Sequence, residues 1–295
     1  MSARILAVAA TTAVVGVCAV HTRAVAARDA GFTAYLYASD YYNSVVNIYD
    51  ARGRHQKPIA QITNSFQYHP MGLTTDALAN LWVVSDDAVQ EYPPGGTNAV
   101  FGFGAAAIPY DAAFGPDGLL YLAAQSGYGY GYIKVYEPGS LYPKRIIRDS
   151  HFRLVYGDAF DASGNLYVSY YDGRGRSRVS EFRHARPPGH DLGLTKADYF
   201  GIAFDASGDL VAANFYAPSI DVFLPGATMP SFRFGRRGAP WYIAFDLTKT
   251  HLFVADYKLN AVEEYSYPEG KLVNTIAGDA GGGFVGVAVG AASSP

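Results

Sequence analysis

Aromatic and acidic side chains that could hold a ligand stand at one recurring place in this sequence. Aromatic residues occupy four equivalent positions, and an aspartate follows closely at two of them, in Tyr110-Asp111 and Tyr156-Gly-Asp158. Flat apolar rings suit a sugar or another planar group, and a few carboxylates are enough to orient a ligand in a mostly apolar pocket. The candidate ligand-binding residues are Tyr110, Asp111, Tyr156, Asp158, Phe200, Trp241, His69 and Arg153.

Familiar catalytic motifs do not occur in the sequence. It has no Gly-x-Ser-x-Gly elbow, no His-Glu-x-x-His motif and no pair of cysteines at metal-binding spacing. His69 and His151 could act as acid–base groups, but a lone histidine in a loop is more often simply solvated. The sequence therefore identifies no catalytic residue.

A repeated hairpin positions the candidate residues. The stretch Gly157-Asp-Ala-Phe-Asp-Ala-Ser-Gly-Asn-Leu-Tyr-Val-Ser169 is copied at residues 201–213. Its apolar start predicts a strand, Asp-Ala-Ser-Gly predicts a tight turn, and the leucine-led run after the turn predicts a returning strand. Weaker copies begin at Gly72, Asp111 and Tyr242, and a truncated copy begins at Gly286.

The spacing of these six anchors (residues 72, 111, 157, 201, 242 and 286) predicts the fold. The steps of 39 to 46 residues average about 43, the length of one four-stranded propeller blade. The last copy has room for one strand, and the start of the chain lacks a first strand. We therefore predict an all-β, six-bladed β-propeller of four-stranded antiparallel blades, closed by pairing residues 286–289 with the N-terminal blade.

Chain direction predicts which end of the channel carries the site. If each first strand runs toward its Asp-Ala-Ser-Gly turn, the anchors lie at the opposite end, together with the loops that follow the second strands. Those loops hold many of the 24 tyrosines. We expect the candidate residues to converge at this mouth of the channel, where longer loops usually form the binding face. The alternative is that the aromatic residues only plug the channel.

The N-terminus predicts export. Arg4 precedes an apolar run over residues 5–20, and cleavage sites follow at Ala26 or Ala27, so residues 1–27 read as a secretory signal peptide and residues 28–295 as a single domain. We expect a secreted or periplasmic protein without further membrane insertion. The lone Cys18 lies in the signal, so the mature chain can form no disulfide. The net charge of −3 gives no sign of the basic surface that binds nucleic acid. We expect a monomer.

The repeat Gly201-Ile-Ala-Phe-Asp-Ala-Ser-Gly-Asp-Leu210 resembles those of NHL-repeat propellers, and it is also similar to the superfamily of the SMP-30/gluconolactonase enzymes. The resemblance covers the whole mature chain. For a lactonase it implies a divalent metal in the channel, bound partly by an Asn and an Asp one residue before their anchors. None of the residues at those places here offers an amide or carboxylate: they are Met71, Tyr110, Tyr156, Phe200, Trp241 and Val285.

Two functional classes remain open. The first is a binding or scaffold module that needs no cofactor and holds a glycan, a peptide or a protein on an aromatic face. The second is a lactonase-like hydrolase with a rearranged site, in which Asp111 and Asp158 are displaced ligands of one divalent cation such as Ca²⁺. We favour the first, because the ligands that the resemblance implies are missing.

Overall fold

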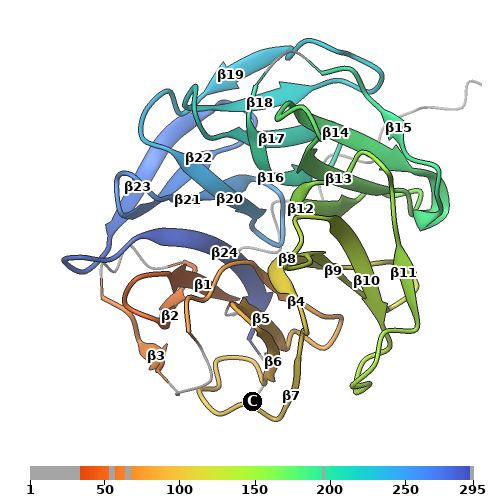
Figure 1. Ribbon diagram of the computed structural model, residues 1–295. Helices are drawn as coiled ribbons and strands as arrows, with labels where there is room; N and C mark the ends of the chain where they lie inside the picture. The colour runs from red at the N-terminus through yellow and green to blue at the C-terminus, as the bar shows by residue number, and fades with distance from the viewer. Residues whose placement is uncertain (1–33, 53–56, 64–67, 195–196, 293–295) are drawn as a thin grey trace, which may run out of the picture. The chain divides into compact units, whose positions relative to one another are not determined.

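Short apolar runs alternate with turn residues along the chain, and each run forms a strand. A computed structural model describes residues 34–52, 57–63, 68–194 and 197–292. Within these residues the strands form six four-stranded antiparallel sheets, which are the blades of a propeller (Figure 1). The predicted fold class is confirmed.

Each blade uses strands that are consecutive in the chain, except blade 1. Blade 1 contains β24 (Phe284–Ala291), β1 (Ala34–Asp40), β2 (Val45–Asp50) and β3 (Ala60–Ile62). Blade 2 contains β4 (Leu73–Thr75), β5 (Leu81–Ser85), β6 (Ala88–Tyr92) and β7 (Phe101–Gly104). Blade 3 contains β8 (Ile108–Phe114), β9 (Leu120–Gln125), β10 (Gly131–Tyr136) and β11 (Arg145–Ile147).

The second half of the ring repeats this order. Blade 4 contains β12 (Leu154–Phe160), β13 (Leu166–Tyr171), β14 (Ser177–Phe182) and β15 (His190–Asp191), with the short 3₁₀ segment η2 (Arg183–Ala185) before β15. Blade 5 contains β16 (Tyr199–Phe204), β17 (Leu210–Asn214), β18 (Ser219–Phe223) and β19 (Phe232–Phe234). Blade 6 contains β20 (Pro240–Phe245), β21 (His251–Asp256), β22 (Ala261–Ser266) and β23 (Lys271–Ala277).

The last strand closes the ring. β24 pairs antiparallel with β1 from Ala34↔Ala291 to Asp40↔Phe284 (Figure 1). The predicted closure through residues 286–289 is confirmed, and the pairing extends to both sides of them. Because β24 covers the edge of β1 along this ladder, the seam leaves no free sheet edge there.

Burial between neighbouring blades forms the core. Trp82 of blade 2, for example, is 1% exposed and packs edge-on against Phe114 of blade 3. Buried tyrosines add hydrogen bonds between blades: Tyr267 donates to Asp205 Oδ2 over 2.8 Å. A large ring with a polar tip suits a position that is packed on both faces but reaches polar groups at its end.

The hairpin turns define one face of the propeller. Asp161 accepts hydrogen bonds from the backbone of Ser163 and Asn165, both at 2.9 Å, and Gly164 takes a φ of 80°. An aspartate that bonds the backbone two residues on, followed by a glycine at positive φ, closes such turns. We call the face formed by residues 76–79, 115–118, 161–164, 205–208 and 246–249 the turn face, and the opposite face the loop face.

The predicted signal peptide, residues 1–27, lies outside the described residues. Among those described, no helix has the length and hydropathy that a membrane crossing needs.

Candidate functional site

The anchor residues lie where the inner strands of neighbouring blades approach closely. Four of the six anchors are glycines, and each of these lies against the anchor of the next blade or the residue before it. A Cβ atom at any of these glycines would lie less than 3.0 Å from backbone of the next blade. The inner strands therefore approach backbone to backbone here, which explains the repeated glycine. The remaining two positions of the ring carry side chains, Asp111 and Tyr242.

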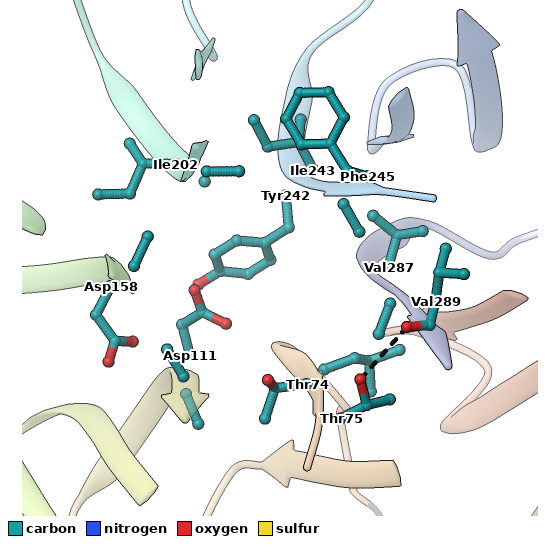
Figure 2. Close-up of a pocket in the computed structure, with 18 of the residues that line it drawn as sticks. Thr74, Thr75, Asp111, Asp158, Ile202, Tyr242, Ile243, Phe245, Val287 and Val289 are labelled. Carbon is teal, nitrogen blue, oxygen red and sulfur yellow. Dashed lines mark hydrogen bonds between the residues drawn. The ribbon is translucent and has the colours of Figure 1, made fainter. Parts of the chain in front are cut away.

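Tyr242 spans the channel at this level. Its ring extends from blade 6 toward Asp111 (Figure 2). Its hydroxyl oxygen lies 3.0 Å from the carbonyl oxygen of Tyr110 and 2.7 Å from that of Tyr156. These carbonyls belong to blades 3 and 4 on the far side of the ring. The single hydroxyl proton is shared between the two acceptors or donated to one at a time. Tyr242 is buried, and burial raises its pKa well above the usual value, with a further rise from the nearby acids.

A cavity of about 550 Å³ extends from Tyr242 toward the turn face. Its walls come from the first strands of all six blades, down to the phenylalanines that precede four of the turns. The small residues two positions after the anchors all line it: Thr74, Ala113, Ala159, Ala203, Ala244 and Ala288. Their small side chains leave the space open. Lys249, in the turn between β20 and β21, lines the end nearest the turn face.

Two buried aspartates line the inner end of this cavity. Figure 2 labels both residues among those that line the cavity. Asp111 is 9% exposed and Asp158 is 4% exposed. Neither carboxylate oxygen of Asp158 has a hydrogen-bond partner among the described residues. Burial raises the pKa of both carboxyl groups well above the usual range, and the charge of Asp111 raises that of Asp158 further. The backbone amide of Ala113 lies near Asp158 outside hydrogen-bonding geometry, so it offsets only part of the rise.

A belt of aromatic rings covers the loop-face side of the same ring. Tyr156 stacks on Phe200 with centroids 4.1 Å apart, Phe200 meets Trp241 at 5.2 Å, and Trp241 meets Tyr257 at 5.4 Å. Ring contacts continue through neighbouring blades until Tyr41 stacks on His69 at 4.4 Å. We call this set the aromatic belt; its members are Tyr41, Tyr42, His69, Tyr110, Tyr156, Phe200, Phe215, Tyr216, Trp241 and Tyr257.

His69 and Arg153, the two remaining candidates on the loop face, already have partners. His69 Nδ1 lies 2.7 Å from Asp86 Oδ2, which holds the imidazole over Tyr41. Arg153 places its guanidinium 4.6 Å from the ring centroid of Tyr130. Arg153 therefore lies at a loop beside the belt, where its cation–π contact orders an exposed tyrosine.

The structure separates the eight predicted residues into two groups. The expected convergence of the four aromatic residues occurs in the belt, whereas Asp111 and Asp158 line the cavity on the other side of Tyr242. The expectation of a single mouth shared by rings and acids is therefore wrong in its geometry, because Tyr242 closes the channel between them. Ligand binding by either group stays a prediction. Phe200 is buried, so this ring fits the alternative in which the aromatic residues only plug the channel.

Two residues of the site are not among the candidates predicted from the sequence. Tyr242 was identified only as the anchor of a weak repeat, yet a tyrosine where four repeats have glycine is a visible signal. Lys249 replaces the glycine of the Asp-Ala-Ser-Gly turn and takes a φ of 55°. Both are departures from the repeat, and both place a polar group in the channel.

A divalent metal of the lactonase type does not fit these residues. The positions before the anchors carry the rings of the belt, with Met71 and Val285 buried at the other two places. Within the described ranges no three acidic, histidine or cysteine side chains come together as a metal site. Two carboxylates fall short of the six to eight oxygen ligands that Ca²⁺ takes. These residues therefore do not form a metal centre of the lactonase type.

Comparison with known proteins supports the fold. No family model matches the sequence, and no curated protein matches it. A chain of the crystal structure of a nidogen/laminin complex is similar with a TM-score of 0.69 and 16% identity, over 87% of this chain and 98% of that chain. These two chains share one fold.

Two bacterial proteins of unknown function are similar as well. The one from Bacteroides caccae gives a TM-score of 0.62 at 15% identity, over 88% of this chain and 99% of that chain. The one from Desulfotomaculum acetoxidans gives 0.59 at 15% identity, over 86% and 98%. Identities this low show the fold alone, and a propeller fold hosts many unrelated functions.

Proposed function

We propose that this protein is an exported, monomeric binding module that engages a protein partner through the aromatic belt. The observation that carries the proposal is the continuity of the belt, whose ring contacts run through residues of all six blades. Rigid tyrosine and tryptophan side chains offer large contact area at low entropic cost and dominate the energetic centres of protein interfaces. The finer assignment to NHL or SMP-30-like propellers belongs to the same proposal.

The exposed rings of the belt identify where a partner would bind. Tyr42 is 54% exposed and Tyr216 is 69% exposed, and both stand on the packed inner rings. Packing from below limits the rotamers of an exposed ring, so less entropy is lost when a partner covers it. A footprint across several blades suits a protein better than a single sugar.

Display selection tests the proposal. A random peptide library is selected against the purified protein, and a glycan array is probed in parallel. We expect peptides whose Kd weakens at least tenfold in the double variant Tyr42→Ser/Tyr216→Ser, which removes two exposed rings.

The matched control removes exposed apolar side chains from the turn face. The double variant Leu78→Ser/Leu247→Ser should bind the selected peptides like the wild type, because both leucines lie in hairpin turns. Peptides that bind the Tyr42→Ser/Tyr216→Ser variant equally well would contradict the belt as docking surface. Glycan binding that depends on the belt would replace the protein partner with a carbohydrate.

A further inference from the structure

The carboxylate of Asp158 is buried without a hydrogen-bond partner in the part of the chain that the structure describes. It is 4% exposed, neither oxygen is hydrogen-bonded among the described residues, and the residue lines a cavity. Folded proteins pair nearly all of their buried polar groups, because an unpaired buried group loses its hydration without compensation. Such a group next to open space indicates that a ligand supplies the missing donors.

We propose that the channel binds a monoammonium ligand with an apolar body, which enters from the turn face and places its ammonium group against Asp158 and Asp111. This site lies on the other side of Tyr242 from the aromatic belt, so it is independent of the function proposed above.

The chemistry of the walls selects this class of ligand. An ammonium group carries up to three N–H donors, which suit the acceptor oxygens of the two carboxylates. Beyond the acids and Tyr242, the cavity is walled mostly by aliphatic and aromatic side chains, among them Ile202, Ile243 and Phe245 (Figure 2). A volume of about 550 Å³ falls within the range of small-molecule pockets. An alkyl or aryl amine therefore matches the acids at one end and the apolar side chains along the walls.

Lys249 limits the ligand to a single positive charge. Its Nζ donates to the carbonyl oxygen of Phe204 over 2.5 Å, and it lines the end of the cavity opposite the acids. A diamine that extended along the channel would bring its second ammonium toward this lysine. Like charges brought close together repel, so the diamine should bind more weakly.

Proton release accompanies binding. The titratable and charged groups that face the pair are Asp111 and Asp158 themselves, Tyr242 and, at the far end, Lys249. Burial raises the pKa of both acids, so the empty site keeps protons that an ammonium ligand must displace into solvent. Affinity should therefore fall as pH falls through the raised carboxyl pKa.

Calorimetry with simple amines tests the proposal. n-Hexylamine, hexan-1-ol and 1,6-diaminohexane are titrated into the purified protein at pH 8. We expect n-hexylamine to bind at least tenfold more tightly than the alcohol or the diamine, and at least tenfold more weakly at pH 5 than at pH 8. Equal affinity for the alcohol and the amine, or no change with pH, would overturn the assignment.

Three variants locate the binding site. Asp158→Asn keeps the shape but removes the charge and should weaken n-hexylamine at least tenfold, whereas Asp87→Asn, at an exposed carboxylate on the loop face, should leave the affinity unchanged. Ala203→Phe should weaken binding by narrowing the cavity. Unchanged affinity in the Asp158 variant would contradict the proposal.

Two further measurements test whether the channel alone binds the amine. Ca²⁺ that displaces n-hexylamine in the wild type but does not bind the Asp158 variant would replace the amine with a divalent cation. The belt variant Tyr42→Ser/Tyr216→Ser should bind n-hexylamine normally. Loss of amine binding in that variant would show that the two sites are not independent, which would overturn the channel assignment.

Discussion

Asp158 is the residue whose chemistry differs most from that of an ordinary core position. Its pKa is raised in the folded state by burial and by Asp111. A carboxyl group with a raised native pKa stabilises the fold below its unfolded pKa, near 4, and this contribution is lost as pH rises through the native pKa. The wild-type protein should therefore lose stability between mildly acidic and alkaline pH because of this residue.

Asp158→Asn is expected to stabilise the empty protein at pH 8. The substitution keeps the shape and removes a charge without a partner, which is worth about 1–3 kcal/mol for a buried polar group. Chemical denaturation at pH 5 and pH 8 measures the effect, and the gain should be larger at pH 8. A variant that is less stable than the wild type at pH 8 would show that the carboxylate has a partner in solution.

Tyr242→Phe is expected to destabilise the protein by about 1–2 kcal/mol, because the carbonyl oxygen of Tyr156 loses its partner in a buried site. The carbonyl oxygen of Tyr110 keeps the hydrogen bond from Gly72 N at 3.0 Å. Urea denaturation measures the loss. Tyr128→Phe is the control, since Tyr128 is 89% exposed, and it should change nothing. Equal stability of the two variants would contradict the role of the hydroxyl across the channel.

At the residue scale, the types of the site residues were predictable from the sequence, but the directions of their side chains were not. Asp111 and Tyr110 are adjacent in the chain, so both were expected at one mouth. The register of β8 shifts between Pro109 and Asp111, and here Tyr110 joins the belt while Asp111 lines the cavity. The separation of rings and acids depends on Tyr242. Its hydroxyl contacts the carbonyl oxygens of Tyr110 and Tyr156, which are 132 and 86 positions away in the chain.

At the scale of the strand, close backbone approach constrains the anchors most. Gly157 Cα faces the carbonyl oxygen of Phe200 in the next blade, and a Cβ atom at this place would come less than 3.0 Å from that oxygen. Ser169 Oγ donates to the same oxygen over 2.5 Å. At this point blades 4 and 5 are therefore joined by a close backbone approach and the Ser169 hydrogen bond rather than by apolar side-chain packing.

Gly157→Ala should cost about 1–3 kcal/mol, as overpacking of a close contact does. Differential scanning calorimetry measures it as a lower Tm. The matched control is Gly127→Ala, because a Cβ atom there would meet nothing within 4 Å. If both variants have the same Tm as the wild type, the inner strands can move apart at this level with little loss of stability.

The hairpins themselves were predictable from the sequence. Aspartate and glycine at fixed positions specify the turn through local hydrogen bonds, as at Asp161 and Gly164, so no distant contact is needed. The fourth strands were harder to locate. β15 has only two residues and β11 and β19 have three each, and such short runs carry little periodicity.

On the scale of the whole molecule, the number of blades followed from the anchor spacing because a ring admits only whole repeats. Residues 286–289 were assigned to the N-terminal blade since each end lacked what the other supplied, and the β1–β24 ladder confirms it. The closed channel could not be predicted in the same way. It depends on one tyrosine that crosses between opposite blades, which no repeat pattern encodes.

Removal of residues 284–295 should destabilise the whole ring. β24 buries seven of its eight residues, among them Phe284, Val287 and Val289, and each large apolar side chain contributes about 1.5–3 kcal/mol. Because 1 kcal/mol shifts the Tm of a protein of this size by roughly 2–4 °C, we expect a loss of about 10 °C or more. Removal of residues 293–295 alone is the control. A truncated protein that melts within about 2 °C of the full chain would contradict closure by this strand.

The pairing of β1 with β24 also determines when the ring can close during synthesis of the chain. Gly286 N donates to Ser39 Oγ, a partner that left the ribosome 247 residues earlier. Until then β1 has a partner only in β2, and its outer edge stays open in the nascent chain. Contacts between positions so distant in sequence form late and slowly. A polypeptide built this way keeps its native ring open until β24 has been synthesised.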